Sequence, residues 1–233
     1  MEFRTFGEAS TPDCLFVLGW GNRPEHEPVR WLIDRIAADG WRVHTATLPP
    51  HVTDVSEQWV RPVESYAADL DEPAVLAHSA GGLTVAHADL DAATTTYLSP
   101  WWDDPPSRQG PIVGLFASIP GNAKFLPSGV SDRSLIGEHA TDEQLADGPD
   151  RVSPAFLRAT KRAHGTLPEI DDEAVVFCSL TDRVVSTRAI GERMPATRTV
   201  LYDGGHELFS SRSRDEHVPT LLSALDRGAD AVV

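Results

Sequence analysis

The stretch Ala74–Ala88, which reads AVLAHSAGGLTVAHA, decides the fold of this chain. Its first four residues form a short apolar run of strand length, and residues 82–88 continue in the apolar pattern of a helix. The chain must turn sharply between the two, and Ser79 stands at the apex of that turn. A serine in such a turn is held in a strained backbone conformation that lifts its hydroxyl above the sheet. The pattern therefore predicts strand, tight turn and helix, with Ser79 as a candidate nucleophile.

Small residues flank this serine. Ala77 lies two positions before it and Gly81 two positions after it, which lets the strand and the helix approach closely. The helix that begins just after Ser79 also points its positive end at the hydroxyl, which favours a bound oxyanion. A short pattern of this kind occurs often by chance. Its meaning therefore depends on what stands elsewhere in the chain.

Apolar runs of strand length recur along the chain, and amphipathic stretches separate them. The expected strands are Cys14–Leu18, Trp41–Thr47, Ala74–Ala77, Thr95–Leu98, Ala174–Cys178 and Thr199–Tyr202. The expected helices cover residues 29–36, 57–70, 82–88, 154–164 and 214–225, and one more begins near Thr141. This alternation is typical of an α/β fold, in which helices cover a mostly parallel sheet.

A long insert separates two of these strands. About 75 residues lie between Leu98 and Ala174, far more than one crossover helix requires. An insert at this point should lie over the carboxyl edge of the sheet, where α/β proteins bind ligands. We therefore expect a core of residues 1–99 and 169–233 and a cap or lid of residues 100–168. The alternative is an excursion that covers the sheet and has no role in binding.

A serine hydroxyl needs a base, and that base needs an acid to hold its tautomer. Both should follow later strands, in the order Ser, Asp, His. Asp182 comes just after the strand that ends at Cys178, and His206 comes just after the strand that ends at Tyr202. The two glycines before His206 should let its loop bend so that the imidazole reaches back. We therefore predict a catalytic triad of Ser79, Asp182 and His206.

An oxyanion hole needs two preorganised N–H donors. The N–H of Ala80, directly after the nucleophile, is one candidate. The other should come from the loop after the first clear strand, where glycines allow an inward turn. Trp20 N–H is the first candidate there and Gly21 N–H the second.

Four other polar residues lie near these motifs and receive lesser roles. Asp103 or Asp104 could replace Asp182 as the acid, but the loop of Asp182 is the expected place. His78 should point to the other side of the turn and serve the structure. Glu207 is interpreted as a charge at a helix terminus.

Two tryptophans begin the insert. Trp101 and Trp102 are candidate substrate-binding residues that could line an acyl pocket, or they could belong to the core of the lid. The chain has neither the phosphate-binding pattern GxxxxGK[ST] nor the dinucleotide pattern GxGxxG. It also has no cluster of His, Cys and carboxylates with metal-ligand spacing. No cofactor and no metal are therefore expected.

The charge balance excludes several partners. The formal net charge is −15, and lysine occurs only at Lys124 and Lys161. Nucleic-acid binding and docking on anionic membranes both need basic patches, so neither is expected. Many carboxylates with few lysines are typical of proteins from salt-loving microbes, because concentrated salt screens the self-repulsion. An ordinary acidic protein is the alternative.

The sequence gives no sign of export or membrane insertion. No apolar run approaches the roughly 20 residues that span a bilayer. The N-terminus lacks a basic start followed by an apolar segment, so no signal peptide is visible. Cys14 and Cys178 each lie in an apolar run and are expected to be buried thiols. These features favour a cytoplasmic protein without a stable membrane anchor.

Taken together, these motifs resemble the α/β-hydrolase superfamily over nearly the whole chain. The segments that carry the resemblance are Leu18–Gly21, His78–Gly82, Thr181–Val185 and Gly204–Leu208. Within the superfamily the sequence is similar to the group of monoacylglycerol lipases, lysophospholipases and small carboxylesterases. Two positions differ from the group: Leu18 stands where it often has histidine, and Ala77 stands where it usually has glycine.

The resemblance implies an α/β-hydrolase sheet with a lid insert after the sixth strand. It also implies a serine hydrolase that cleaves a small-molecule carboxylic ester through an acyl-enzyme on Ser79. Other reactions of the scaffold stay open, namely C–C bond hydrolysis and cleavage of amides or peptides, as does a non-catalytic binding protein. The intact Ser, Asp and His argue against the last of these. The sequence makes no prediction of the oligomeric state.

Overall fold

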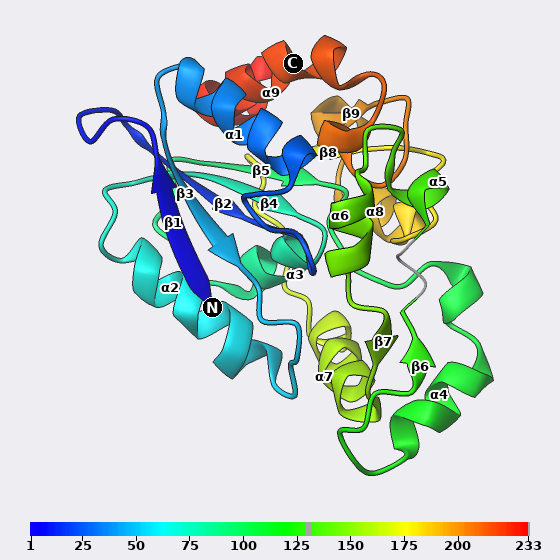
Figure 1. The fold of residues 1–233 in the computed structure, drawn as a ribbon. Helices are drawn as coiled ribbons and strands as arrows, with labels where there is room; N and C mark the ends of the chain where they lie inside the picture. Colours follow the sequence, from blue (N-terminus) through cyan, green and yellow to red (C-terminus); the bar gives the residue numbers. More distant parts are fainter. Residues whose placement is uncertain (129–131, 233) are drawn as a thin grey trace.

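In the computed structural model, which describes residues 1–128 and 132–232, seven strands form one sheet in the order β1-β3-β2-β4-β5-β8-β9 (Figure 1). Strand β1 is antiparallel to β3, and all other neighbours run parallel. The strands are β1 (Glu2–Phe6), β2 (Asp13–Val17), β3 (Arg42–Thr47), β4 (Ala74–His78), β5 (Thr94–Leu98), β8 (Val175–Cys178) and β9 (Thr199–Leu201). The predicted α/β sheet is confirmed.

Helices cover both faces of the sheet (Figure 1). One face carries α1 (Glu27–Ala38) and α9 (Arg214–Arg227). The other carries α2 (Arg61–Ala67), α3 (Ala80–His87) and α8 (Thr187–Arg193). Because both faces are buried, β2, β4 and β8 contain continuous apolar runs, which is why they stand out in the sequence.

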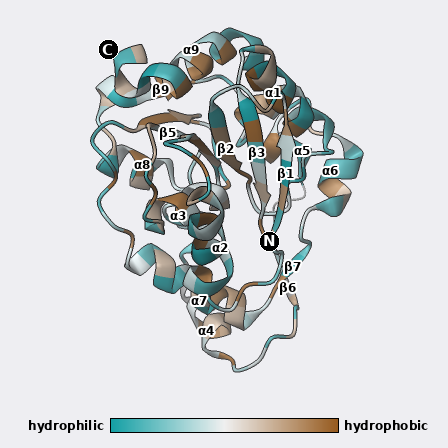
Figure 2. Ribbon diagram, turned by 90° about the vertical axis from the view of Figure 1, so that its left-hand side faces the viewer, coloured by the Kyte–Doolittle hydropathy of each residue, from teal (hydrophilic) through white to brown (hydrophobic). Residues whose placement is uncertain are grey.

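The packing of β2 illustrates this double burial. Leu15 and Val17 pack into the cluster under α2 and α3, whereas Cys14 and Phe16 pack into the cluster under α1 and α9. All four side chains are fully buried. Hydrophobic residues concentrate in these central strands, and hydrophilic residues are frequent on the surrounding helices (Figure 2). Within the described ranges no helix is long and apolar enough to cross a membrane.

Two parts of this architecture differ from the sequence prediction. Strand β1 was not expected, because Glu2–Phe6 is short, mostly polar and exposed, and lies at an edge of the sheet. The helix expected over residues 57–70 begins instead as a π-helical turn, Ser56–Val60, before α2. Pro62 lacks an N–H and cannot continue the regular hydrogen-bond ladder, so a wider turn precedes it.

The insert between β5 and β8 is built from short elements. They are α4 (Pro111–Ser118), β6 (Leu126–Pro127), α5 (Arg133–Ile136), α6 (Asp142–Asp147), β7 (Arg151–Val152) and α7 (Pro154–Gly165). The helices expected near Thr141 and over residues 154–164 are present as α6 and α7. The insert follows the fifth strand and not the sixth, because only one strand, β1, precedes β2 in this chain. In Figure 1 α4, β6 and β7 project away from the sheet.

Candidate active site

Ser79 lies at the junction of β4 and α3 in a conformation that non-glycine residues rarely adopt. Its φ is 52° and its ψ is −116°. Such strain costs about 1–3 kcal/mol and persists only where the surrounding contacts enforce it. The Ser79 N–H donates to the Leu98 carbonyl at 3.0 Å, and the Ser79 carbonyl accepts from the Trp101 N–H at 2.9 Å. The start of the insert thus helps to hold the turn.

Close packing of α3 on β2 explains the glycine that follows. A Cβ atom at Gly81 would overlap the carbonyl oxygen of Val17. Only glycine lets the first turn of the helix lie directly on this strand. At the other small position, Ala77 is completely buried in the core, so its methyl group fits where the family resemblance leads one to expect glycine.

His206 and Asp182 form a buried pair at the ends of two neighbouring strands. His206 Nδ1 lies 2.8 Å from Asp182 Oδ2, and both side chains are at least 96% buried. Asp182 Oδ1 accepts further hydrogen bonds from the N–H groups of Val184 at 2.7 Å and Val185 at 3.2 Å. An ionised carboxylate is an acceptor only. Nδ1 therefore carries the hydrogen, and Nε2 is left as the basic atom of the ring.

The surroundings of Asp182 keep it ionised. Burial by itself raises the pKa of this carboxyl, but the charge of His206 and its hydrogen bond lower it, and the N–H groups of Val184 and Val185 lower it further. The net result is a pKa below the ordinary value of 3.8. Asp182 thus remains a carboxylate at neutral pH and can stabilise a positive charge on His206.

The loop that carries His206 is held by the insert. The N–H of His206 donates to the Leu135 carbonyl at 2.8 Å, and the N–H of Glu207 donates to the Ile136 carbonyl at 2.9 Å. A Cβ at Gly205 would lie 2.6 Å from the Ile136 carbonyl oxygen. Neither glycine before His206 has a positive φ. Close approach to α5, and not the expected loop flexibility, is therefore the reason for Gly205.

Ser79 and His206 face one cavity of about 330 Å³. Predicted site residues that share its wall are Trp20, Ala80 and Trp101. Asp182 lies behind His206 and is bonded to it. Apolar residues of the insert complete the wall: Phe116, Pro127, Ile136, Leu145, Val152, Phe156 and Leu157. The cavity thus brings the catalytic candidates together with a mainly apolar surface.

The two candidate substrate-binding tryptophans have different positions. Trp101 is in the cavity wall, and its indole N–H donates to Asp104 at 3.0 Å. Trp102 is only 1% exposed and is absent from the described lining. Its ring packs edge-on against Tyr97 beneath α3. Trp102 is therefore core, and only Trp101 can touch a ligand in this cavity.

The loop after β2 has the geometry of an oxyanion turn. The Asn22 N–H donates to the Gly19 carbonyl at 3.0 Å, and Gly21 has a φ of +91°, as a type II turn requires. Among the described hydrogen bonds none uses the N–H of Trp20 or of Ala80 as donor. Both residues line the cavity beside Ser79. These two N–H groups are thus available to a bound oxygen.

Asp103 and Asp104 have other partners than His206. The Asp103 carboxylate accepts from the Asp104 N–H at 2.8 Å and from Gln109 at 3.1 Å. Asp104 lines the cavity and accepts from Trp101. In the described part of the chain, Asp182 is thus the carboxylate hydrogen-bonded to His206.

The predicted orientation of His78 is wrong. Its ring lies 4.9 Å from the ring of His206 and contributes to the cavity wall. Nδ1 lies 3.2 Å from Asn22 Oδ1. Burial and the nearby charge of His206 lower the pKa of His78 well below 6.5. His78 is therefore a neutral ring within the site, because β4 ends with this side chain on the same side as the oxyanion turn.

Glu207 stands at the N-terminus of the short helix Leu208–Ser210, as interpreted from the sequence, but its burial in the site was not predicted. It is 4% exposed, lines the cavity, and accepts hydrogen bonds from Asn22, Gln144 and Ser210. Sequence reasoning missed Asn22 and Gln144 as well. A signal was available only for Asn22, which stands in the oxyanion loop. Gln144 lies more than 60 residues from its partner.

Other chemistries find little support in the described residues. Cys14 and Cys178 are buried free thiols, as predicted. Burial raises the pKa of Cys14 to about 12 and that of Cys178 to about 11, so neither is a thiolate at neutral pH. Across residues 1–128 and 132–232, no group of three or more His, Cys, Asp or Glu is arranged to hold a metal ion.

A model of the alpha/beta hydrolase family matches residues 9–218, which is most of the chain. The chain belongs to the alpha/beta hydrolase family. Solved structures share this hydrolase fold at low sequence identity. The monoacylglycerol lipase of Paleococcus ferrophilus is 20% identical with a TM-score of 0.75, and the match covers 99% of this chain and 98% of that one.

Two further structures extend the comparison. A soluble variant of monoglyceride lipase from Saccharomyces cerevisiae, in complex with a substrate analogue, has a TM-score of 0.72 at 15% identity and covers 96% of this hydrolase and 91% of its own chain. An esterase from Exiguobacterium antarcticum has a TM-score of 0.68 at 14% identity, with 96% and 94% covered. No curated protein sequence matches this hydrolase significantly.

Proposed function

We propose that this hydrolase cleaves carboxylic esters through an acyl-enzyme on Ser79. One observation carries the proposal. His206 Nδ1 lies 2.8 Å from Asp182 Oδ2 in a buried pair, and His206 faces the same cavity as Ser79, whose backbone is strained. Backbone strain at Ser79 costs free energy without improving core packing, and it is typical of a nucleophile at a strand-to-helix turn. A hydrogen-bonded acid, a base with a free Nε2 and a nucleophile are the parts that acyl transfer needs.

The reaction follows from these positions. His206 Nε2 takes the proton of the Ser79 hydroxyl as its oxygen attacks the ester carbonyl, and Asp182 stabilises the imidazolium. The N–H groups of Trp20 and Ala80 stabilise the oxyanion. The intermediate expels the alcohol, which takes the proton from His206. Water then attacks the acyl-enzyme with His206 again as base, which releases the acid and restores Ser79.

An ester is the best-supported substrate class. The family resemblance leads to monoacylglycerol lipases and small carboxylesterases, and the structures reported above are lipases and an esterase. The aromatic and aliphatic wall of the cavity suits the chain of an acyl group. Its volume of about 330 Å³ favours small or medium acyl groups. Esters of this size are the proposed substrates.

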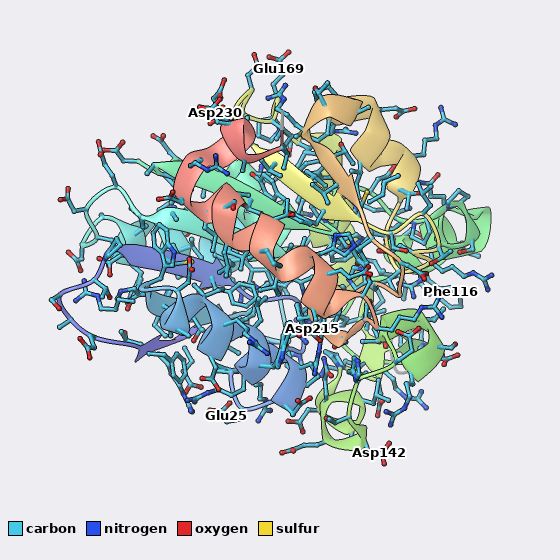
Figure 3. All side chains as sticks on the ribbon, turned by 90° about the horizontal axis from the view of Figure 1, so that it is seen from above. Glu25, Phe116, Asp142, Glu169, Asp215 and Asp230 are labelled. Carbon is cyan, nitrogen blue, oxygen red and sulfur yellow. The ribbon has the colours of Figure 1, made fainter. Side chains whose placement is uncertain are left out.

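We further propose that the protein is adapted to concentrated salt. The net charge of −15 is spread over the surface. Figure 3 shows acidic side chains at the periphery on several elements, among them Glu25, Asp142, Glu169, Asp215 and Asp230. Salt screens repulsion among such charges, so ester turnover and the melting temperature should both rise with salt concentration.

A serine-reactive fluorophosphonate and a series of p-nitrophenyl esters of graded chain length test the proposal together, in low and in high salt. We expect the wild type to be labelled and to turn over esters. Ser79→Ala should lose labelling completely and lose turnover by at least about 10⁴-fold, because the nucleophile is absent.

Ser134→Ala is a matched control, because Ser134 is an exposed serine of the insert. It should label like the wild type. A folded wild type that is neither labelled nor active on any ester would overturn the proposal in favour of a binding protein. Turnover of amides with no turnover of esters would change the proposed activity to that of an amidase.

A further inference from the structure

The carboxylate of Glu207 has no part in the reaction described above, yet it is buried in the cavity wall. It is 4% exposed and accepts three hydrogen bonds. Its Oε1 accepts from Asn22 Nδ2 at 2.9 Å, and its Oε2 accepts from Gln144 Nε2 at 2.7 Å and from Ser210 Oγ at 2.6 Å. A buried carboxylate with several donors is costly to form and fixes the groups around it.

The three donors belong to different parts of the molecule. Asn22 closes the oxyanion turn, Gln144 lies on α6 of the insert, and Ser210 follows the loop of His206. Glu207 itself is the residue after the catalytic base. One side chain thus joins the oxyanion turn, the insert and the base loop.

The direction of each hydrogen bond is determined by the carboxylate. Because Glu207 only accepts, the amide nitrogen of Asn22 must face it, and Asn22 Oδ1 must face His78. His78 Nδ1 therefore donates to Asn22. Both faces of the Asn22 side chain are occupied, which leaves the turn Gly19–Asn22 one orientation.

Further contacts join the α6 region to this turn and to the loop that follows it. A Cβ at Gly21 would lie 2.6 Å from Pro149 Cδ, so the segment after α6 lies directly on the turn. Asp147, the last residue of α6, lies 3.3 Å from His26 Nε2 and 3.5 Å from Arg23 Nε in the loop that follows. The insert therefore contacts the oxyanion turn at Gly21 and the loop that follows the turn at Arg23 and His26.

The oxyanion turn needs such support from outside. Where the family resemblance leads one to expect a histidine, this chain has Leu18, which is fully buried among apolar side chains and has no polar atom to offer. Within the turn Gly19–Asn22, the side-chain amide of Asn22 is a polar group that a neighbour can hold. This amide is held by Glu207 and by His78.

We propose that Glu207 is a positioning residue that holds the turn Gly19–Asn22 so that the Trp20 N–H faces the oxyanion. This inference rests on the proposed ester hydrolysis. It assigns to the insert, through Gln144, a share in the support of the oxyanion hole. A residue of this kind affects the transition state more than the binding of the ester.

Glu207→Gln tests the proposal, because it keeps the shape of the side chain but presents an N–H where an acceptor is needed. We expect kcat to fall about tenfold to hundredfold, somewhat less than the loss of a whole oxyanion donor, with KM within about twofold. Glu192→Gln makes the same change on the exposed face of α8 and should leave both constants unchanged.

A second variant separates positioning from mere stability. When Asn22→Asp is combined with Glu207→Gln, the amide nitrogen introduced at position 207 can donate to the carboxylate introduced at position 22, which still accepts from His78. The number of charges and hydrogen bonds is conserved and only the direction is reversed. We expect this double variant to recover at least about half of the lost activity on a logarithmic scale, by the logic of a double-mutant cycle.

The outcomes distinguish this inference from the proposed function. An unchanged kcat in Glu207→Gln, or a double variant no more active than the single one, overturns the positioning role. Fluorophosphonate labelling of the wild type would still support the proposed serine hydrolase. The amide resonances of Trp20 and Gly21 give a readout without turnover. They should shift in Glu207→Gln and return in the double variant. Unchanged resonances in the single variant overturn the inference even if the wild type cleaves no ester.

Discussion

Two segments of the insert between β5 and β8, one with α5 and α6 and one with α4 and α7, contact the loops of the proposed catalytic residues in different ways. The segment with α5 and α6 uses buried polar contacts: backbone carbonyls of α5 accept from the His206 loop, and Gln144 donates to Glu207. The segment with α4 and α7 uses aromatic packing. Phe156 of α7 stacks on Trp20 with ring centres 4.6 Å apart and lies 6.2 Å from Trp101.

Part of the second segment is exposed, although Phe156 itself is buried. On and just after α4, Leu115 is 67% exposed and Ile119 is 38% exposed, and Arg158 of α7 holds the end of α4 by donating to its carbonyls. Ile136 and Gln144 of the first segment are instead buried. Directional hydrogen bonds fix geometry, whereas apolar contacts accept different shapes.

The insert is therefore not one uniform lid. Its α5–α6 segment is hydrogen-bonded to the loop of the proposed catalytic base, and its α4 and α7 helices supply aromatic side chains to the wall against which an acyl group would lie. Changes in the catalytic loops and their supports should alter how fast any ester reacts. Changes in α7 should alter which ester reacts.

The largest effect expected from breaking the catalytic side is that of Asp182→Asn. The amide cannot accept from His206 Nδ1 with the strength of a carboxylate, so the wrong tautomer of the ring gains population. We expect kcat to fall about 10⁴-fold for short and long esters alike. Steady-state kinetics on the graded p-nitrophenyl esters measures this.

Asp103→Asn provides the matched control, since its carboxylate bonds to Gln109 and to the backbone and not to His206. It should stay within about threefold of wild type, the range usual for a residue outside the reacting groups. A large loss in Asp103→Asn with a small one in Asp182→Asn would move the acid to the end of β5 and contradict the site described here.

A smaller effect, of a different kind, is expected from Phe156→Leu on the wall side. The shorter side chain enlarges the cavity between Trp20 and Trp101. One methylene in an apolar pocket is worth about 1–3 kcal/mol. We therefore expect the ratio of kcat/KM for long over short acyl chains to rise about tenfold, with kcat on the best ester nearly unchanged.

Phe125→Leu makes the same substitution at a 38% exposed position of the insert outside the described cavity lining. It should leave the chain-length profile as it is. If Phe156→Leu lowered kcat equally on all esters, the two segments would not divide the work as the comparison claims.

The smallest expected effect concerns stability at acidic pH, and it tests the ionisation of Asp182. The pKa of Asp182 is held below 3.8 in the folded protein. Its contribution to stability is therefore present above the ordinary value and is lost as the pH falls through the folded pKa. Thermal melts from pH 6 to pH 3 should show a steeper loss for wild type than for Asp182→Asn. Parallel curves would show that Asp182 is not stabilised as a carboxylate.

The sequence by itself predicted the sheet and the triad. β2, β4 and β8 are buried on both faces, so their apolar runs stand out in the sequence, and turn residues mark their ends. Ser79 directly follows its strand, and Asp182 and His206 lie in the loops that follow theirs. Because the carboxyl ends of parallel strands meet at one edge, positions along the chain were enough to predict the meeting of His206 and Asp182 that the structure shows.

The surroundings of the predicted triad follow only from the tertiary structure. His78 and Glu207 lie next to the predicted residues in sequence, yet the direction of His78 and the buried bonds of Glu207 were not predicted, because the direction of a side chain in a turn depends on its partners. Trp101 and Trp102 are adjacent, and only packing could separate wall from core. Local geometry follows from the order of residues, whereas the partners of Glu207 come from segments up to 185 residues away, and no local pattern brings them together.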